Sequence, residues 1–563
     1  MTEENGTPPL AKRFVDDCKV CFEHVKSHIV QHSNLCEQDI HEVVETLFFR
    51  LLFLRFLEEK EWLTFSGNTN YLSALCDSGG IDSKSVYLSR FRPLFSKGLS
   101  VEGNQEDSAY GSVPFLNLNL FHKTSLDVLD WDVSDDVIQS LLGRNGLFYT
   151  YVFNIDEFSS SEAINPEIIG TLFEELLIDR KERGAFYTPK PVVGYMCTEG
   201  IKLILEERTN VPIEQVMGLV DHDSLEKISM KQAELLRKKL LSITAIDPAC
   251  GSGAYLIGLL QEMARIHRTL STYLGDSNGS EFNLKRQLIS KSLFGIDIDS
   301  NAVHRTKCRL WLSLATDSPK PFSVSRDEFN LETGDSLLGL GPQCVQDVLA
   351  NDGGFDLVLA NPPYVRHGHI NPDFKKELFR QYSRLEDSPV HNTSDLYCYF
   401  FVRANQFLRT NGIQIFICSN SWLDAHFGTS LQQYLLRETH IISLIDSRKK
   451  KQFSNADVNT IISIIRKSKP ADTNFILLES KFSEAILYPE LRTTRRISQE
   501  QMVQSGLDIR GLYVGQRLSL FHRAPEIYLT MNDRIQPISR ELQQLARISR
   551  GSSTGANAFF YLS

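Results

Sequence analysis

The spacing of apolar and polar positions divides the chain into a helical first part and a later part of short strands and helices. Across residues 40–63 the apolar positions keep a helical period, which predicts an amphipathic helix. Residues 64–111 turn rich in Ser, Gly and Asp, which is typical of loops. Asn165-Pro166 predicts the cap and first turn of another helix. We therefore predict a mainly helical N-terminal domain over residues 1–182.

Further along, the pattern becomes that of an α/β domain. Residues 243–246, 293–297 and 355–360 are short apolar runs that stop at Asp or Asn-Pro, as buried strands do. Residues 254–270 and 301–314 return to a helical period. Strands that alternate with helices predict a doubly wound sheet, in which ligands bind at the carboxyl ends of the strands. The residues at those ends are therefore the candidates for chemistry.

A glycine-rich turn, Asp247-Pro-Ala-Cys-Gly-Ser-Gly253, follows the first of these strands and leads directly into a helix. This layout places the polar part of a ligand against a helix N-terminus. Gly251 and Gly253 permit close backbone approach, and Asp247 is placed to hold an ammonium group. The turn is neither a Gly-x-Gly-x-x-Gly nor a phosphate-loop motif. Taken alone, such a sequence is often just a tight turn.

Two further strand ends carry an acid. Asp297 closes the second strand, where a carboxylate can accept hydrogen bonds from both hydroxyls of a ribose. Its separation from Asp247 exceeds the usual spacing of about 20 residues, and the polar stretch 271–282 suggests an insertion or a lengthened helix. Asp335 could accept the adenine amine of a nucleoside cofactor or could simply cap a turn. Both interpretations of Asp335 stay open.

The apolar run 355–360 ends in Asn361-Pro362-Pro363-Tyr364. Each Pro fixes its own φ and disfavours the α region for the residue before it, so Asn361 is held extended in a stiff loop. The side-chain oxygen of Asn361 and the carbonyl oxygen of Pro362 can both accept N–H groups of an adenine amine, while Tyr364 stacks on the base. Fixed acceptors favour a tetrahedral nitrogen whose lone pair faces an electrophile. The alternative is an ordinary strand followed by a Pro-Pro turn.

Composition is that of a soluble globular protein. The chain has 563 residues, of which 42% are hydrophobic and 23% charged. Its start lacks the basic and apolar regions of a signal peptide, and its most apolar stretch, residues 47–63, is interrupted by arginines and acids, so no membrane span is predicted. The ten cysteines are typical of reduced, cytoplasmic thiols. Cys18 and Cys21 have zinc-like spacing without a second pair, so we favour buried helix cysteines and predict no metal site.

The net charge of −10 argues against a wholly basic nucleic-acid binder, though not against a local basic cleft. Two basic clusters stand out, residues 448–451 and the group Arg492, Arg495 and Arg496. Each is equally consistent with contacts to DNA phosphates and with a solvated surface. Phosphate contacts would make DNA binding weaken steeply with salt.

Taken together and in this order, the motifs resemble the class I S-adenosylmethionine-dependent methyltransferases, specifically their DNA adenine-N6 branch with the gamma motif order. The likeness covers residues 164–470 and implies a Rossmann-like methyltransferase domain over residues 183–470. The resemblance also implies a set of site residues. These are Tyr187, Thr188 and Pro189 in the first motif at the methionine end of the cofactor, Asp247, Ala249, Gly251 and Gly253 in the glycine loop, Asp297 at the ribose, Ile298 against the cofactor adenine, Asp335 at its amine, and Asn361, Pro362, Pro363 and Tyr364 in catalysis.

The flanking regions extend the resemblance. The N-terminal region is similar to that of large methyltransferases of restriction–modification and phage-defence systems, the type IIG-like group. Residues 471–545 are expected to form a connector, and residues 546–563 resemble the opening of a target-recognition domain. The short length of that last segment implies either a truncated protein or another polypeptide that reads the bases. No nuclease motif is evident, so a fused endonuclease is not expected.

The expected function is therefore site-specific methylation of the exocyclic amine of an adenine that is flipped out of double-stranded DNA. S-adenosylmethionine is the expected methyl donor, and a separate specificity or nuclease subunit is a conceivable partner. Other hypotheses stay open. The chain could methylate RNA or a protein glutamine, it could be the methyltransferase subunit of a nuclease complex, or it could be a non-catalytic DNA-binding partner that binds the cofactor without transferring its methyl group.

Overall fold

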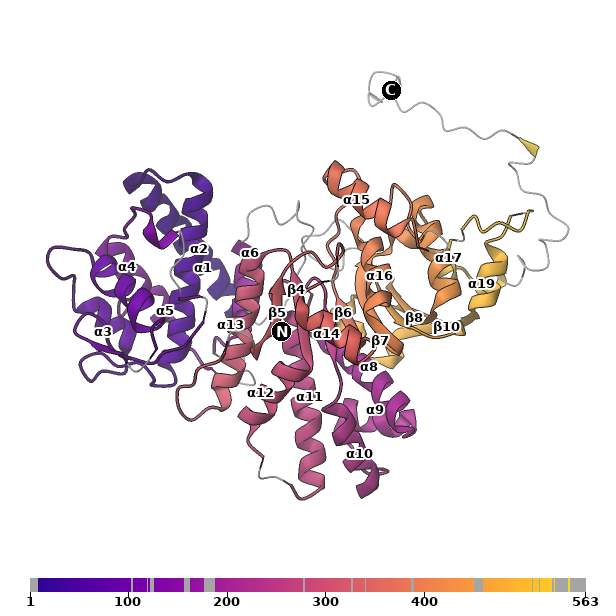
Figure 1. Ribbon diagram of the computed structural model, residues 1–563, viewed down its shortest axis with the longest axis horizontal. Coiled ribbons are helices and arrows are strands. Elements are labelled where there is room, and N and C mark those ends of the chain that lie inside the picture. Colours follow the sequence, from indigo (N-terminus) through magenta and orange to yellow (C-terminus); the bar gives the residue numbers. More distant parts are fainter. Residues whose placement is uncertain are drawn as a thin grey trace.

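The computed structural model describes most, but not all, of the residues of the chain. The described residues are 9–102, 105–118, 120–121, 126–155, 163–176, 188–276, 279–325, 328–339, 341–385, 389–449, 459–508, 510–515, 517–528, 531 and 545–546. Figure 1 shows an elongated molecule in which a helical region occupies one end and a region built around a sheet occupies the rest.

The N-terminal region is mainly helical, as predicted. Its two long helices, α1 (Pro9–His32) and α2 (Glu37–Glu58), pack against each other. α2 stops at Glu58, short of the predicted end at residue 63, and Glu61 just beyond it adopts a left-handed conformation with φ of 55°. The shorter helices of this region are α3 (Tyr71–Asp77), α4 (Asp135–Leu142), α5 (Leu147–Thr150) and α6 (Ile168–Leu176).

Residues 64–111, predicted as loops, contain regular structure. The elements within or overlapping this stretch are α3, helical turns at Tyr87–Phe91 and Leu94–Gly98, and a hairpin of β1 (Gln105–Asp107) and β2 (Gly111–Val113). Tyr87, Phe91 and Leu94 are fully buried. The loop prediction was wrong because the Ser, Gly and Asp content hid these widely spaced apolar residues, which give the segment a side that faces the core.

Within the described chain, nine strands form one mixed sheet in the order β11-β10-β8-β9-β7-β6-β3-β4-β5. Their bounds are β3 (Ala245–Asp247), β4 (Leu293–Asp297), β5 (Asn330–Thr333), β6 (Phe355–Ala360), β7 (Leu408–Ser419), β8 (His440–Ser447), β9 (Thr460–Arg466), β10 (Asp472–Leu478) and β11 (Arg492–Ser498). The five strands from β5 to β7 in this order run parallel, whereas β9 is antiparallel to both of its neighbours. β3 and β6 are adjacent, so the glycine turn and the Asn-Pro-Pro-Tyr loop leave the sheet side by side.

Helices cover both faces of this sheet. Along β6, Leu357 and Leu359 join the core that contains α8 and α11, whereas Val358 and Ala360 join the core that contains α16. This alternation is the two-residue period of a strand buried on both faces. The helices of the first face are α8 (Lys190–Thr209), α9 (Ile213–His222), α10 (Met230–Leu240), α11 (Ala254–Tyr273), α12 (Glu281–Lys291) and α13 (Ser300–Asp317); those of the second are α14 (Gln343–Asn351), α15 (Pro372–Tyr382), α16 (Leu396–Phe407) and α17 (Thr429–Glu438).

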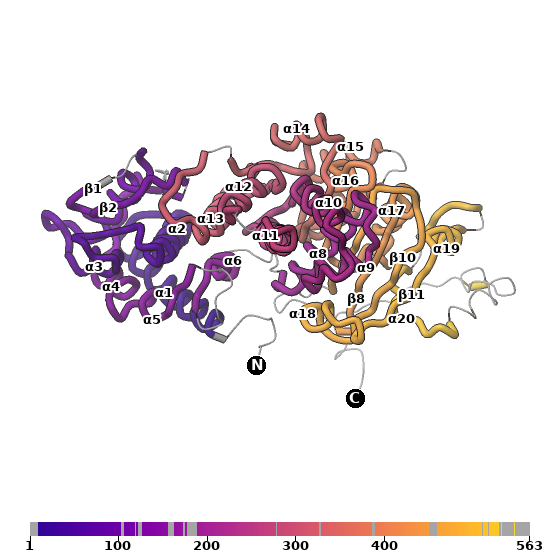
Figure 2. The backbone as a smooth tube through the Cα atoms, turned by 90° about the horizontal axis from the view of Figure 1, so that it is seen from below, coloured from indigo at the N-terminus to yellow at the C-terminus, as the bar shows by residue number. Residues whose placement is uncertain are grey.

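The helical region joins the sheet region through α13. Trp311 of α13 lies 5.5 Å from Phe53 of α2 between ring centroids and stacks on Phe322 at 4.7 Å. Both regions contribute to one continuous hydrophobic core. Seen from below in Figure 2, α13 lies beside α2, and β8, β10 and β11 lie toward the other end of the molecule.

The segment expected to be a connector, residues 471–545, contributes β10 and β11 to the same sheet. It also contains the short helices α18 (Phe482–Ala485), α19 (Gln499–Ser505) and α20 (Leu520–Arg523). Apart from residue 546, the segment predicted to begin a target-recognition domain lies outside the described residues. Cys18 and Cys21 lie on α1, the first buried and the second half-buried. Within the described ranges, no helix combines the length and apolar character needed to cross a bilayer.

Candidate active site

The carboxyl ends of β3, β4, β5 and β6 meet at one cavity of about 680 Å³. The predicted site residues on its lining are Thr188, Asp247, Ala249, Gly251, Asp297, Ile298, Asp335, Asn361 and Pro363. Four others, Pro189, Gly253, Pro362 and Tyr364, adjoin the lining in sequence without forming part of it. Tyr187 lies outside the described residues. The fold thus brings four separate strand ends to a single site.

The glycine turn is held close to α13. Gly251 and Gly253 have positive φ values of 50° and 82°. A Cβ atom on Gly253 would lie 2.5 Å from Cγ2 of Thr306, so only glycine fits there. At Gly251 a Cβ would meet no protein atom within 4 Å, and its φ alone favours glycine. The Thr306 hydroxyl donates to the Gly251 carbonyl oxygen at 2.9 Å, which fixes the turn against the helix.

Of the two acids nearest the turn, Asp247 is buried and Asp297 is half-buried, and backbone amides bind both. Asp297 accepts the N–H of Gly251 at 2.8 Å and that of Asp299 at 2.9 Å, and Asp247 accepts the N–H of Ala249 at 3.0 Å. Burial raises the pKa of Asp247 well above its ordinary value, and it also raises the pKa of Asp297, although the amide hydrogen bonds act in the opposite direction. A ligand that supplied further donors would relieve the cost of these buried charges.

The other two strand-end residues predicted to contact the cofactor, Ile298 and Asp335, differ in their surroundings. Ile298 is 75% exposed, an unusual position for a large apolar side chain that lines a cavity. One carboxylate oxygen of Asp335 accepts the N–H groups of Leu337 and Leu338 at 2.8 and 3.2 Å, so Asp335 does cap a turn. Asp335 also lines the cavity, and its second oxygen allows both roles at once.

The Asn-Pro-Pro-Tyr loop is anchored at both ends. The amide nitrogen of Asn361 donates to the hydroxyl of Thr188 at 3.1 Å. The hydroxyl of Tyr364 donates to the carbonyl oxygen of Ile417 on β7 at 3.2 Å, and burial raises the pKa of Tyr364 well above its ordinary value. A tethered, uncharged phenol on a stiff loop is suited to stacking against a flat ring.

The structure adds site residues that the sequence did not single out. Tyr255, at the start of α11, donates to the Thr188 hydroxyl at 3.3 Å and lines the cavity. Arg305 lines the cavity too, pairs with Glu45 of α2 and lies 3.7 Å from Asp299. Neither residue belongs to a recognisable local motif, so no signal in the sequence could have selected them. Phe374 and Phe400 supply apolar walls from α15 and α16.

The basic clusters are only partly available to a partner. Arg495 donates to the carbonyl oxygens of Phe521 and Ala524 at 2.6 and 3.0 Å, which makes it a structural residue. Arg448 and Arg496 form exposed ion pairs with Glu479 and Asp472 at 2.7 and 2.8 Å. Residues 450 and 451 lie outside the described part of the chain.

Comparison with known proteins gives matches over this same region. Residues 291–453 match the family of the Eco57I restriction-modification methylase, and residues 224–321 match the MmeI DNA-methyltransferase domain. A Methanocaldococcus jannaschii protein assigned as a type II restriction enzyme and methyltransferase is 28% identical over 340 residues, which cover 54% of this chain and 28% of that protein. The type II restriction enzyme and methyltransferase RM.Eco57I of Escherichia coli is 24% identical over 311 residues, which cover 49% of this chain and 31% of that protein.

Among solved structures, the type IIL restriction-modification enzyme MmeI in complex with DNA is similar in fold. The TM-score is 0.58 at 17% sequence identity, and the match covers 87% of this chain and 60% of that chain. These findings confirm the resemblance to methyltransferases of restriction–modification systems and the Rossmann-like fold. The chain spans less than a third of the length of each of these two curated relatives, 28% of the first and 31% of the second.

Proposed function

We propose that the chain is a site-specific DNA adenine-N6 methyltransferase of a restriction–modification or phage-defence system, with S-adenosylmethionine as the methyl donor. The observation that carries the proposal is the shared cavity. Asn361, from the loop after β6, lines the same 680 Å³ space as the glycine turn and the two strand-end acids Asp297 and Asp335. A target amine held by Asn361 would therefore lie next to a cofactor held by the other loops.

The residues of the cavity fit this cofactor. Its volume falls in the range of about 300–1,000 Å³ that is usual for small-molecule sites. Asp297 would accept the ribose hydroxyls, Ile298 would pack on the adenine and Asp335 would accept its amine, while Asp247 and the backbone at Gly251 would hold the methionine end. The bound cofactor would supply an electrophilic methyl group.

The protein's own part in the reaction is to present the amine. The Asn361 side-chain oxygen and the Pro362 carbonyl oxygen would accept its two N–H groups, which favours a tetrahedral nitrogen with its lone pair toward the methyl group. Tyr364 would stack on the extruded base, a contact worth about 1–3 kcal/mol. An adenine stacked in a duplex cannot reach this loop, so the base must be flipped out. The amine gains the methyl group and releases one proton to water.

Methyl transfer from labelled cofactor to duplex DNA, RNA and protein in parallel tests the substrate class. The proposal predicts label in duplex DNA. Label confined to RNA or to a protein glutamine would replace it with one of those substrates. Labelled duplex together with metal-dependent cleavage in the presence of a companion polypeptide would identify the methyltransferase subunit of a nuclease complex.

A further inference from the structure

Thr188 lies at a junction of three elements that are distant in the sequence. It precedes α8, its side chain is buried, and its hydroxyl contacts both Tyr255 of α11 and Asn361 of the loop after β6. The Asn361 amide nitrogen lies 3.1 Å from the Thr188 oxygen, and the Tyr255 hydroxyl lies 3.3 Å from the same atom. The junction borders the cavity, since all three residues are on its lining.

The hydrogen-bond directions at this junction are ordered. A threonine hydroxyl has two acceptor positions and one donor. An amide N–H can only donate, so Thr188 accepts from Asn361. The Tyr255 hydroxyl has the Thr188 oxygen and the weaker acceptor sulfur of Met196, at 3.5 Å, within reach. Burial raises the pKa of Tyr255 well above its ordinary value, which keeps the phenol protonated as a donor.

This order matters because the two ends of an asparagine amide are nearly identical in shape and opposite in polarity. In one orientation the Asn361 oxygen accepts from a target amine. In the flipped orientation its NH₂ group would face another NH₂ group, and both would be donors. In the observed arrangement the amide nitrogen faces the Thr188 hydroxyl, so the Asn361 oxygen lies on the opposite side of the amide group.

We propose that Thr188 and Tyr255 are positioning residues that hold the Asn361 amide with its oxygen toward the reacting amine. Tyr255 fixes the position of the Thr188 hydroxyl, and Thr188 holds the amide nitrogen of Asn361 on its own side. The resemblance assigns Thr188 to the cofactor, whereas this inference assigns its hydroxyl to the catalytic loop. It rests on the proposed function, because it needs Asn361 to act on an amine.

The test compares kcat and cofactor affinity in three variants of the full-length chain. Thr188→Val removes the hydroxyl at nearly constant volume and is expected to lower kcat by about 10–100-fold, by analogy with the loss of a group that orients a metal ligand from its outer shell. Thr188→Ser keeps the hydroxyl and should retain most of kcat. Tyr255→Phe should lower kcat by about 2–10-fold, the factor that one neutral hydrogen bond is worth. The cofactor Kd, measured by calorimetry, should stay unchanged in all three.

Matched controls lie on α8, the helix that follows Thr188, and on α11, the helix that holds Tyr255. Thr198→Val removes a hydroxyl that donates to the Tyr195 carbonyl oxygen at 3.1 Å within α8, and Tyr273→Phe removes one that donates to the Ile228 carbonyl oxygen at 2.8 Å at the end of α11. Neither control should change kcat. A weaker cofactor Kd in Thr188→Val with kcat preserved would overturn the inference and support the cofactor role.

A double-mutant cycle supplies a readout that a merely structural role would not produce. In an Asn361→Ala background, Thr188→Val should cause no further loss of the residual rate, because the amide that it orients is gone. Independent losses that multiply would contradict the inference. If wild type and all variants fail to methylate any amine while binding the cofactor, the proposed function fails. If wild type is active and Thr188→Val matches it, only the positioning role fails.

Discussion

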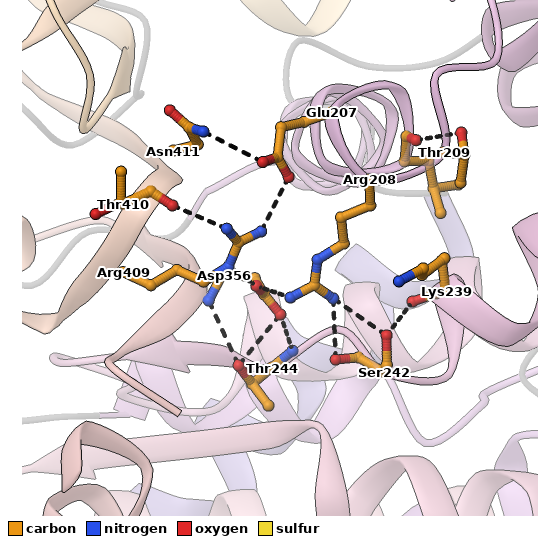
Figure 3. Close-up of polar contacts among 11 residues, drawn as sticks. Glu207, Arg208, Thr209, Lys239, Ser242, Thr244, Asp356, Arg409, Thr410 and Asn411 are labelled. Atoms are coloured by element: carbon orange, nitrogen blue, oxygen red, sulfur yellow. Dashed lines mark hydrogen bonds and ion pairs between the residues drawn. The ribbon is translucent and has the colours of Figure 1, made fainter. Parts of the chain in front are cut away.

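Carboxylate side chains lie at both ends of strand β6, and their surroundings differ. At its carboxyl end the strand leads to a cavity where the buried Asp247 and the half-buried Asp297 have raised pKa values. At its amino end the carboxylate of Asp356, 1% exposed, is enclosed by the guanidinium groups of Arg208 and Arg409, as Figure 3 shows. One end thus pairs its carboxylate with two cations of the protein, whereas the acids at the other end are bound by backbone amides.

We call the amino end of β6, at Asp356, the closed end and its carboxyl end, at the cavity, the open end. Thr244 donates to Asp356 through its backbone N–H at 2.8 Å and its hydroxyl at 3.3 Å, which ties β6 to the residue before β3. Glu207 of α8 accepts from Arg409 at 3.1 Å and from Asn411 at 3.3 Å (Figure 3). The network joins β3, β6, β7 and α8 at one point. Such an anchor keeps the strand, and the loop at its far end, in a fixed register.

At the open end the largest effect is expected from Asn361→Ala. Loss of a fixed acceptor should lower the rate of methyl transfer by about 10²–10³-fold or more. The cofactor Kd should be nearly unchanged, because the acceptor faces the amine. Single-turnover transfer and calorimetry on the same preparation measure both quantities. Near-normal turnover would remove Asn361 from catalysis.

At the closed end, Asp356→Ala should act on stability instead. Breaking a buried ion pair costs about 3–5 kcal/mol, since two guanidinium groups lose their shared partner. Asp472→Ala is the matched control, because its ion pair with Arg496 is exposed and is worth about 0–1 kcal/mol. Denaturant unfolding of both variants gives the comparison. Equal losses in the two variants would show that the network does not anchor β6.

Asp297→Ala changes a residue of the open end and should weaken cofactor binding. Removal of the charged acceptor for the ribose hydroxyls should raise the cofactor Kd by about 10–100-fold. The same change also removes the acceptor of the Gly251 N–H, so the glycine turn is held less firmly and cofactor binding weakens further. Calorimetric titration with the cofactor checks it, and an unchanged Kd would exclude the ribose role.

Asp247→Asn should produce the smallest effect, which is a change in how the stability of the folded protein depends on pH. The folded-state pKa of Asp247 is raised, so the folded protein binds this proton more readily than the unfolded chain. The stability of wild type must therefore fall as pH rises from the ordinary pKa of Asp through the raised value. Asparagine does not titrate and can still accept from the Ala249 N–H.

Thermal unfolding without cofactor, followed across pH for both proteins, tests this sign. The Asp247→Asn variant should match wild type most closely in acid and become relatively more stable as pH rises. If the wild type instead became more stable relative to the variant toward neutral pH, the protein itself would be stabilising the ionised carboxylate of Asp247.

Local pattern was enough to predict the strands and loops of the open end. The run 293–297 matches β4, and the run 355–360 matches β6, because each is bounded by a turn or an acid. The prediction that four strand ends converge followed from the parallel order of a doubly wound sheet. The contact between Thr188 and Asn361 joins residues 173 positions apart and left no local trace.

The closed end could not be predicted in the same way. Asp356 appears in the sequence as one polar residue in an apolar run, and its partners come from α8 and β7, far along the chain. The misjudged segment 64–111 has a similar cause, since its buried apolar residues are widely spaced along the chain and are covered only by the surrounding core. Tertiary packing decides both cases, and single-sequence patterns do not carry it.

The most direct test of the account is nucleoside analysis of duplex DNA after reaction with the full-length protein and methyl-labelled cofactor. The account predicts labelled N6-methyldeoxyadenosine from wild type and its loss in Asn361→Ala at equal cofactor binding. Label on another base or another atom, or labelled adenine that persists at an equal level in the variant, would contradict the role of the open end of β6.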